Sequence, residues 1–443
     1  MSRRASQTAA SLSCFGLLAC LATPGAAAQT NRPAFDFMGR LLVVASDGDM
    51  QAAAYAGDIL GPPERDVLSV IRLDAGNQPV AAGTVEVPNS VIGPPASLSV
   101  SPDGRYAIVV ETRGLRPANR PDARLRDLPP GRAITVVDLR DPDRPLVAQQ
   151  LTGRDNPISV SIRADGKWVA IAYDTSGAGG PPLDLYTFAN GRLSGSWSPA
   201  IPGFGDGDTL KNAAFAPTGA LALVYATRPR LSLVQVSEDG HPATLISWGN
   251  DVPLGRMPFE VRFTPDGRFA LVNDMHVPAE GADVRGTVAS IPLGEGRAPD
   301  GTPQHRLVSE ARTGVMPEGL AVSPDARWVA TTNLERSFYA ADDPRQGFFA
   351  SVTLLRLDPQ TGRLTRVGDF PFAGVIPEAA AFDNSSQYLA VTSFDHLGEQ
   401  ASRGSVDFWR IAGDFQDPAR VELTPTGYSV PVARGVQSME VVR

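Results

Sequence analysis

Two glutamates, Glu318 and Glu378, each follow a proline at the start of a short apolar segment of the chain. If the two side chains meet at one site, their mutual repulsion raises the pKa of one carboxyl group. A carboxyl group whose pKa lies near neutrality can exchange protons with a substrate. We therefore take Glu318 and Glu378 as candidate catalytic residues.

Eight further polar residues are candidates for binding a ligand near these glutamates. They are Glu111, Lys211, Arg256, Asp274, His276, Asn333, His396 and Arg434. Arg256 and Arg434 suit an anionic substrate, because a guanidinium group binds carboxylate or phosphate through paired hydrogen bonds. The alternative is that all eight are hydrated surface groups, as exposed polar side chains usually are.

His276 and His396 stand beside Asp274 and Asp395, a pairing compatible with acid–base chemistry or a metal, although solvated loop histidines are more common. The sequence contains no Gly-x-Ser-x-Gly, no His-Glu-x-x-His and no phosphate-binding Gly-rich loop. Hydrolases with a nucleophile elbow, zinc proteases and nucleotide-dependent enzymes are therefore not expected. The sequence predicts neither a metal site nor a cofactor.

The elements that must position these residues are repeated hairpins. An apolar strand, a turn of the Ser-Pro-Asp-Gly type and an aromatic-led strand recur at 98–108, 160–170, 213–223, 261–271, 320–330 and 380–390. Proline presets the first turn residue, Asp bonds to its own backbone and Gly accepts the positive φ of a tight hairpin. The copies recur about every 50 to 60 residues, close to the size of a four-stranded propeller blade.

A second set of strands gives the number of blades. Alternating apolar segments follow at 67–73, 133–139, 183–188, 231–236, 288–293, 351–357 and 405–411, one more than the hairpins. The missing hairpin is supplied by both chain ends, with 435–441 paired to 40–45. The sequence thus predicts an all-β, seven-bladed β-propeller whose last blade is closed by the N- and C-terminal strands.

This geometry locates a functional face. Because each hairpin turn lies at one end of its blade, the start of the inner strand and the end of its partner meet at the opposite end, around the central channel. We call this end the mouth and the other the turn face. Six long connections also leave the mouth: 47–66, 112–132, 174–182, 275–286, 334–349 and 394–404. Binding residues commonly lie on long loops held by a rigid scaffold, so the mouth is the expected site.

The first 28 residues resemble an export signal. Arg3 and Arg4 precede a short apolar stretch, and small residues at 26–28 suit a signal peptidase. We expect a signal peptide at 1–28 and a single propeller domain at 29–443, in the periplasm or secreted. Cleavage at Cys20 to give a lipoprotein is the alternative. Both cysteines, Cys14 and Cys20, precede residue 29, so the mature chain is expected to contain no thiol.

The net charge of −8 becomes more negative once Arg3 and Arg4 are removed. An acidic surface without basic clusters disfavours nucleic acid and anionic membranes as partners. The expected partner is a small molecule or a protein, with no membrane insertion after signal removal, and we expect a monomer.

The chain resembles a known family over most of its mature length, and the resemblance is carried by its structural turns. The segment 354–364, Leu-Leu-Arg-Leu-Asp-Pro-Gln-Thr-Gly-Arg-Leu, followed by the proline-led strand after Val375, resembles the lactonase and YVTN-type seven-bladed propellers. The resemblance implies that fold, and a family that includes lactonases as well as exported proteins without established catalysis. The chain has Pro-Glu at Pro317 and Pro377, where lactonase-like members often have Pro-Arg or Pro-His, so no catalytic residue is transferred.

Two functions remain open. The first is a non-catalytic exported propeller that binds a small ligand or protein partner at its mouth. The second is a lactonase-like hydrolase or isomerase acting on a lactone or an anionic sugar or organic acid, with Glu318 or Glu378 as the base and Arg256 or Arg434 holding the substrate.

Overall fold

The computed structural model describes residues 35–58, 60–73, 78–177, 179–239, 242–276, 284–396, 403–415 and 417–443. The expected signal peptide at 1–28 lies outside the described residues. The chain divides into two units, Met1–Phe35 and Asp36–Arg443, and the strands of the described residues belong to the second. A search of the described residues for a helix long and apolar enough to cross a membrane finds none.

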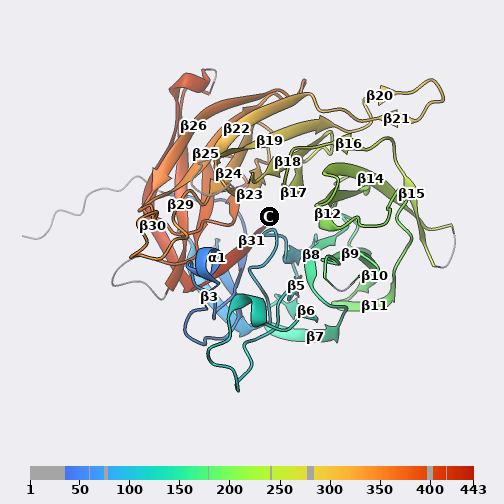
Figure 1. Cartoon of the computed structure of the whole chain (residues 1–443). Helices are drawn as coiled ribbons and strands as arrows, with labels where there is room; N and C mark the ends of the chain where they lie inside the picture. The colour runs from blue at the N-terminus through green and yellow to red at the C-terminus, as the bar shows by residue number, and fades with distance from the viewer. Residues whose placement is uncertain are drawn as a thin grey trace, which may run out of the picture. The chain divides into compact units, whose positions relative to one another are not determined.

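Seven antiparallel sheets form a ring of blades around a central channel (Figure 1). The innermost strands, from blade 1 to blade 7, are β31 (Val436–Val442), β4 (Leu98–Val100), β8 (Pro157–Ile162), β12 (Leu210–Phe215), β17 (Pro258–Phe263), β23 (Pro317–Val322) and β27 (Ala380–Phe382). The second strands are β1 (Leu41–Ser46), β5 (Tyr106–Val110), β9 (Trp168–Tyr173), β13 (Leu221–Tyr225), β18 (Phe269–Asp274), β24 (Trp328–Asn333) and β28 (Tyr388–Ser393). Inner strands of neighbouring blades contact one another around the whole ring.

The outer half of each blade has two further strands. The third strands are β2 (Val67–Arg72), β6 (Ala133–Asp138), β10 (Leu183–Ala189), β14 (Arg230–Ser237), β19 (Arg285–Pro292), β25 (Ala350–Leu357) and β29 (Arg403–Gly413). The outermost are β3 (Val80–Glu86), β7 (Leu146–Thr152), β11 (Arg192–Trp197), β15 (Thr244–Ser247), β22 (Ser309–Val315), β26 (Leu364–Phe372) and β30 (Val421–Ala433). The short elements are β16 (Val252–Pro253), β20 (Gly296–Arg297), β21 (Pro303–Gln304), α1 (Ala54–Gly57), η1 (Leu125–Asp127) and η3 (Pro418–Arg420).

The predicted seven-bladed propeller and its closure are confirmed. Strand β1 from the beginning of the chain pairs on one side with β2 and on the other with β31, with Leu41 opposite Val442 and Ala45 opposite Ser438. Blade 1 therefore joins the two ends of the chain. Such closure leaves no unpaired edge between the first and last blades of the ring.

The repeated turns adopt the backbone that their residues favour. Gly104 and Gly267 have φ of 64° and 69°. Ala326 and Ser386 stand at the same turn position and adopt φ of 57° and 61°, although L-residues seldom occupy this region. The hairpin pattern thus retains its turn geometry even where glycine has been replaced.

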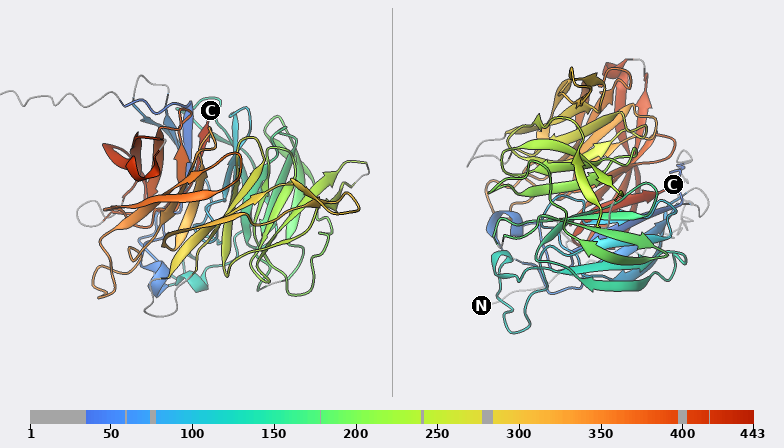
Figure 2. Two further views of the ribbon diagram at one scale, coloured as in Figure 1. Left: turned by 90° about the horizontal axis from the view of Figure 1, so that it is seen from above. Right: turned by 90° about the vertical axis from the view of Figure 1, so that its right-hand side faces the viewer.

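The hydrophobic core lies between adjacent blades. Leu183 and Leu185 of blade 3, for example, pack with Leu223 and Tyr225 of blade 4. Because this packing holds the sheets rigidly, the side chains at the ends of the inner strands are fixed in position. Helix α1 and η1 lie together on one side of the ring, opposite the C-terminus (Figure 2), and they belong to the long connections that leave the mouth.

Candidate functional site

The mouth is covered by the connection between β1 and β2. We call residues 47–58 and 60–66 the covering segment; it includes α1 and the buried residues Met50, Ala54 and Leu60. Beneath it Glu318 is 2% exposed and Glu378 is fully buried. The two candidate catalytic residues are therefore enclosed groups rather than hydrated surface carboxylates.

Glu378 is contacted by the covering segment directly. The hydroxyl of Tyr55, from α1, donates a hydrogen bond to Oε1 of Glu378. Burial raises the pKa of Glu378 well above its usual value, and the neighbouring Glu318 raises it further, while the hydrogen bond from Tyr55 lowers it. The pKa of Tyr55 is also raised, first by burial and then by the charges of Glu318 and Glu378. Burial and the neighbouring carboxyl group thus both disfavour the anionic form of Glu378.

Glu318 lies between one basic and one acidic neighbour. Burial raises its pKa to about 8, Glu260 contributes in the same direction, and Lys211 opposes them. Burial lowers the pKa of Lys211, while Asp174 and Glu318 favour its charged form. The Nζ of Lys211 lies 5.0 Å from the centre of the Phe259 ring, a cation–π distance. The structure thus joins Glu318, Glu378 and Lys211 in one electrostatic cluster.

A second group of charges lies deeper in the channel. Nε of Arg262 is 2.7 Å from Oε1 of Glu260, and Nη1 of Arg262 is 2.9 Å from Oε1 of Glu440 in blade 1. Burial raises the pKa of Glu260 to about 7, while Arg262 lowers it. Oε2 of Glu260 accepts a hydrogen bond from the amide of Leu320. These contacts link blades 1, 5 and 6. They place ionisable side chains deeper in the channel than Glu318 and Glu378.

Apolar side chains from several mouth loops surround the acidic cluster. Tyr55 and the buried ring of Phe259 pack within this group, which we call the mouth cluster. Its buried members are Met50, Ala54, Leu60, Val91, Leu128, Phe259, Met275, Val315, Met316, Leu334, Phe338, Val375, Ile376 and Phe394. They exclude water from the carboxyl groups, which is the physical cause of the raised pKa values.

Two arginines hold the covering segment in place. Nη2 of Arg434 donates to the carbonyls of Gly48 and Pro62 at 2.7 and 3.2 Å. Nη2 of Arg116 donates to the carbonyl of Gly61 at 2.6 Å. The side chain of Arg434 is buried, so the structure places this predicted substrate-binding residue in the anchorage of the covering segment.

Carboxylates complete that anchorage. Asp66 accepts hydrogen bonds from the amides of Gly48 and Asn89, and Asp47 accepts one from the amide of Val91. Burial raises the pKa of Asp66 to about 7. It also raises the pKa of Asp47, with added repulsion from Asp66 and Asp49. The covering segment is thus fastened in part by Asp66, whose pKa lies near neutral pH.

Three other candidate residues bond to nearby backbone or side chains of their own blades. Asp274 accepts hydrogen bonds from the amides of Met257 and His276. Asn333 bonds to Ser351 and neighbouring threonines within blade 6. Glu111 accepts from the amides of Arg132 and Ala133, and burial raises its pKa. These contacts fix the bases of mouth loops.

The last three candidates are His276, His396 and Arg256, and their contacts do not involve Glu318 or Glu378. Nδ1 of His276 is 3.8 Å from Asp274. Nε2 of His396 is 3.0 Å from Oγ of Ser405, and Arg256 is exposed. Among the described residues, no three His, Cys, Asp or Glu side chains group as metal ligands would.

Sequence reasoning missed Tyr55 and Glu260. Tyr55 lies in the connection between β1 and β2, where no strand periodicity predicts the course of the chain. Its hydroxyl bonds to Glu378, which is 323 positions away in the sequence. Glu260 directly follows Phe259 at the start of an inner strand. A search of the first three residues of each inner strand would have found it.

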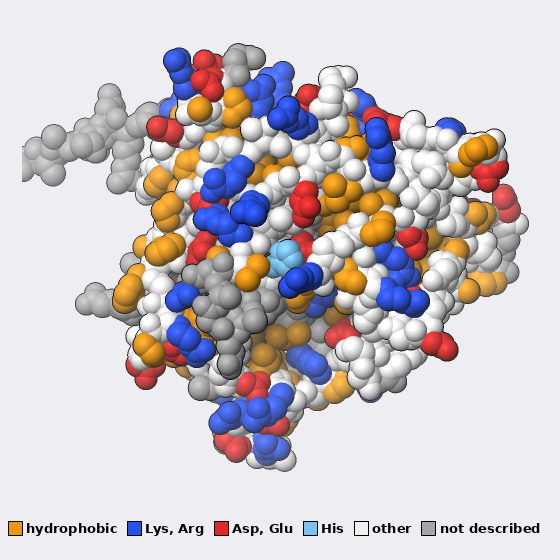
Figure 3. All heavy atoms as spheres, turned by 45° about the horizontal axis from the view of Figure 1, so that its top comes forward, with side chains coloured by type: hydrophobic (Ala, Val, Ile, Leu, Met, Phe, Trp, Pro, Cys, Tyr) orange, Lys and Arg blue, Asp and Glu red, His pale blue; other side chains and the backbone are white. Residues whose placement is uncertain are grey.

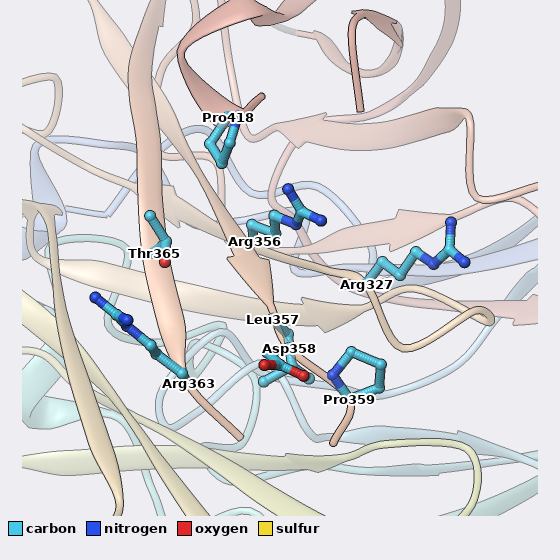
Figure 4. Close-up of a pocket in the computed structure, with 8 residues that line it drawn as sticks. All are labelled: Arg327, Arg356, Leu357, Asp358, Pro359, Arg363, Thr365 and Pro418. Carbon is cyan, nitrogen blue, oxygen red and sulfur yellow. The ribbon is translucent and has the colours of Figure 1, made fainter. Parts of the chain in front are cut away.

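Two further hollows differ in character from the mouth. A hollow of about 470 Å³ on the turn face of blade 6 is lined by three arginines, Arg327, Arg356 and Arg363 (Figure 4). Another, of about 510 Å³, lies beside the covering segment and includes Asp66, Leu115 and Arg116. On the face shown in Figure 3, basic and acidic side chains are interspersed with hydrophobic ones. The three arginines lie at the turn-face ends of their strands, whereas Glu318 and Glu378 lie at the mouth ends.

Comparison of the sequence with models of protein families and with curated proteins finds no match. Solved structures do match. A putative 6-phosphogluconolactonase from Bacteroides fragilis is 14% identical, with 93% of this chain and 100% of that chain covered and a TM-score of 0.60. A periplasmic gluconolactonase from Pseudomonas aeruginosa is 18% identical, with 91% and 99% covered and a TM-score of 0.59. A protein of unknown function from Desulfotomaculum acetoxidans is 13% identical, with the same coverage and a TM-score of 0.58.

These likenesses concern the fold. The chain has the seven-bladed architecture of lactonase-type propellers over nearly its whole described length. This confirms the resemblance drawn from residues 354–364 at the level of the fold. Activity is a separate matter, because one propeller scaffold supports many functions.

Proposed function

We propose that the protein is a lactonase-like hydrolase that opens a lactone at the covered mouth. One observation carries the proposal. Oε2 of Glu318 and Oε2 of Glu378 are both buried and make no hydrogen bond to any described residue. Buried carboxyl oxygens normally have partners, so two unpartnered ones at the same enclosed site are suited to a water molecule and a substrate.

The environments of the two glutamates suggest different roles. Glu318, with a pKa of about 8 and Lys211 nearby, acts as the general base that takes a proton from water. Glu378, whose pKa burial also raises and whose Oε1 already accepts a hydrogen bond from Tyr55, acts as the general acid. A pair of carboxyl groups with different neighbours is a common acid–base arrangement.

The reaction follows from these roles. Water loses a proton to Glu318 as its oxygen adds to the lactone carbonyl carbon, and Lys211 stabilises the negative charge that develops on the carbonyl oxygen. The bond between the acyl carbon and the ring oxygen then breaks, and the departing oxygen receives a proton from Glu378. Tyr55, already hydrogen-bonded to Glu378, orients that carboxyl group. The product is a hydroxy acid.

Access to the site requires the covering segment to move, because both carboxyl groups are enclosed. The segment is held by hydrogen bonds rather than by interleaved strands: those of Arg434, Arg116 and Asp66 lie near its ends, and those of Tyr55 and Asp58 near its middle. A segment held in this way can open without disturbing the blades. Closure of such segments over a substrate shields the reaction from bulk solvent.

The test is lactone hydrolysis by purified protein, followed through acid release. Glu318→Gln should lower kcat by about 100-fold or more, since a general base typically contributes 10²- to 10⁴-fold. Glu310→Gln is the matched control, because Glu310 is exposed on outer strand β22. Equal activity of the Glu318 variant and the control would remove Glu318 from the mechanism.

The second candidate function is ligand binding without catalysis, favoured by the complete enclosure of the carboxyl groups. In that case a lactone or hydroxy acid raises the Tm of the protein and no acid is released. Glu378→Gln would then abolish the ligand-induced Tm shift. That loss would distinguish a ligand-binding role of Glu378 from a purely structural one.

The likeness to a periplasmic gluconolactonase and the signal-like residues 1–28 also support our proposal that the protein is exported. We further propose that the mature chain begins near Gln29 and is a monomer. Intact mass of protein from the exported fraction tests the first point, since a lipidated Cys20 would change both the mass and the start of the chain. Light scattering tests the second.

A further inference from the structure

On the basis of the proposed hydrolysis, we infer that the substrate is an uncharged lactone that carries an apolar substituent, rather than a phosphorylated or carboxylated sugar lactone. The juxtaposition that supports this is a pair of buried glutamates enclosed by the mouth cluster. The inference concerns the chemistry that this mouth can accommodate.

The surroundings of the glutamates are largely apolar. Phe259 stacks under Lys211, Tyr55 packs within the mouth cluster, and Ile376 is fully buried two positions before Glu378. A sugar presents several hydroxyl groups, each of which needs a hydrogen-bonding partner when it is buried. The mouth cluster supplies mainly carbon and sulfur atoms, which favour an alkyl group.

Methionine is concentrated at this site. The chain contains 7 methionines, and Met50, Met257, Met275 and Met316 all belong to the mouth cluster or pack against it. Methionine is flexible and polarisable, and it is common at surfaces that accept apolar ligands of varied shape. Its concentration here supports a binding wall for an acyl or alkyl chain.

Enclosure of the mouth disfavours an anionic substrate. Glu318 and Asp47 both raise the pKa of Glu378, and Lys211 is the cation that acts on Glu318. Arg434 and Arg116 donate to carbonyls of the covering segment. A phosphate group would therefore be buried among apolar side chains and carboxyl groups, with both of these guanidinium groups already engaged, and an unpaired buried charge is costly.

The turn face offers a contrast within the same molecule. Three arginines line one hollow there, whereas the two arginines that anchor the covering segment at the mouth, Arg116 and Arg434, donate to backbone carbonyls. A phosphosugar lactonase would be expected to direct a guanidinium group toward the substrate at the mouth.

The experiment compares three lactones that share a six-membered ring: glucono-δ-lactone, its 6-phosphate and δ-decalactone. Each buried methylene contributes about fourfold to binding, so kcat/KM for δ-decalactone should exceed that for the phosphate by at least about 10-fold. A preference for the phosphorylated lactone would overturn the inference and leave the proposed hydrolysis intact. Hydrolysis of none of the three would overturn the proposed function.

If none of the three lactones is hydrolysed, a binding measurement still tests which class of ligand the mouth accepts. A δ-lactam with the same alkyl chain should raise the Tm more than 6-phosphogluconate does, whether or not the protein is an enzyme. A larger Tm shift with 6-phosphogluconate would contradict the inference by a route independent of turnover.

Variants of the mouth cluster give the final test. Met275→Gln should lower kcat/KM for δ-decalactone by about 10-fold or more and affect glucono-δ-lactone less, because only the alkyl chain loses its contact. Met275→Leu should retain the preference, and Met38→Gln is the control, since Met38 is 48% exposed. If Met275→Gln reduces both substrates equally while the Tm is unchanged, the cluster does not contact the substituent and the inference fails.

Discussion

The two ends of the blades use acidic side chains in opposite ways. At the turn face, Asp266 is exposed, accepts hydrogen bonds from Thr264 and the amide of Arg268, and has a lowered pKa because these bonds outweigh its desolvation. At the mouth, burial raises the pKa values of Glu318 and Glu378. An aspartate that bonds to its own turn stabilises the fold, whereas an enclosed carboxyl group costs stability and is available for chemistry.

This difference has a structural cause. The turns are short, so their carboxylates find amide donors within two or three residues. The mouth is formed by long connections that fold back over the channel, and two of its carboxyl groups, those of Glu318 and Glu378, are enclosed near apolar side chains instead. The comparison therefore predicts that changes at the mouth alter activity and that changes at the turn face alter stability.

The largest effect is expected from a truncation that disrupts both the mouth and the turn face. Removal of residues 434–443 deletes β31, which closes blade 1 against β1. The ring would lose its innermost strand and expose unpaired strand edges, so we expect aggregation or loss of a cooperative thermal transition. Calorimetry measures this directly. A cooperative transition at an unchanged Tm in the truncated protein would show that ring closure does not stabilise the fold.

The next largest effect is expected from a substitution at the mouth that changes activity but not stability. Glu378→Gln should lower turnover by about 100-fold or more, with a Tm at pH 7 close to that of the native protein, because the amide has nearly the same shape as the buried carboxyl group and carries no charge. Paired measurements of acid release and Tm decide the matter. Loss of stability without loss of turnover would mean that Glu378 supports the structure only.

The pH dependence sharpens the comparison. With a pKa of about 8, the base Glu318 is increasingly protonated below pH 8, so kcat should fall about tenfold for each pH unit below that value. In Glu318→Gln the same decline should disappear from the residual rate. A native profile that is flat between pH 6 and 9 would rule Glu318 out as the base.

Stability should respond to pH with the opposite sign at the two ends. A carboxyl group with a raised pKa in the folded state binds protons more tightly there, so its contribution to stability is complete below its unfolded pKa and is lost as pH rises through about 8 for Glu318. Asp266, with a lowered pKa, contributes above its unfolded pKa and loses its contribution as the pH falls. Denaturation at several pH values, in the native protein and in Glu318→Gln, tests the first sign.

The smallest effect is expected at a single turn. Asp266→Ala removes the hydrogen bonds to Thr264 and Arg268 and should lower the free energy of unfolding by about 1 kcal/mol, with kcat unchanged. Urea denaturation and the lactone assay together test it. A reduced kcat in this variant, at unchanged stability, would place the functional site at the turn face and reverse the comparison.

What the sequence determined by itself was the scaffold. The Ser-Pro-Asp-Gly turns, including the variant turns at Ala326 and Ser386, form through bonds between residues only a few positions apart, so their positions predict the hairpins. The alternation within each strand predicts which face is buried. The number of blades and the pairing of β1 with β31 follow from counting these local signals, and the structure confirms them.

The chemistry of the mouth was decided only by the tertiary structure. The sequence placed Glu318 and Glu378 at strand starts around one opening, but it did not show that Tyr55 bonds to Glu378 or that Arg434 fastens Gly48 and Pro62. These contacts join residues more than 300 positions apart, through a segment without strand periodicity. Its course depends on packing against loops of other blades, and that packing determines which carboxyl groups lose water and which pKa values rise.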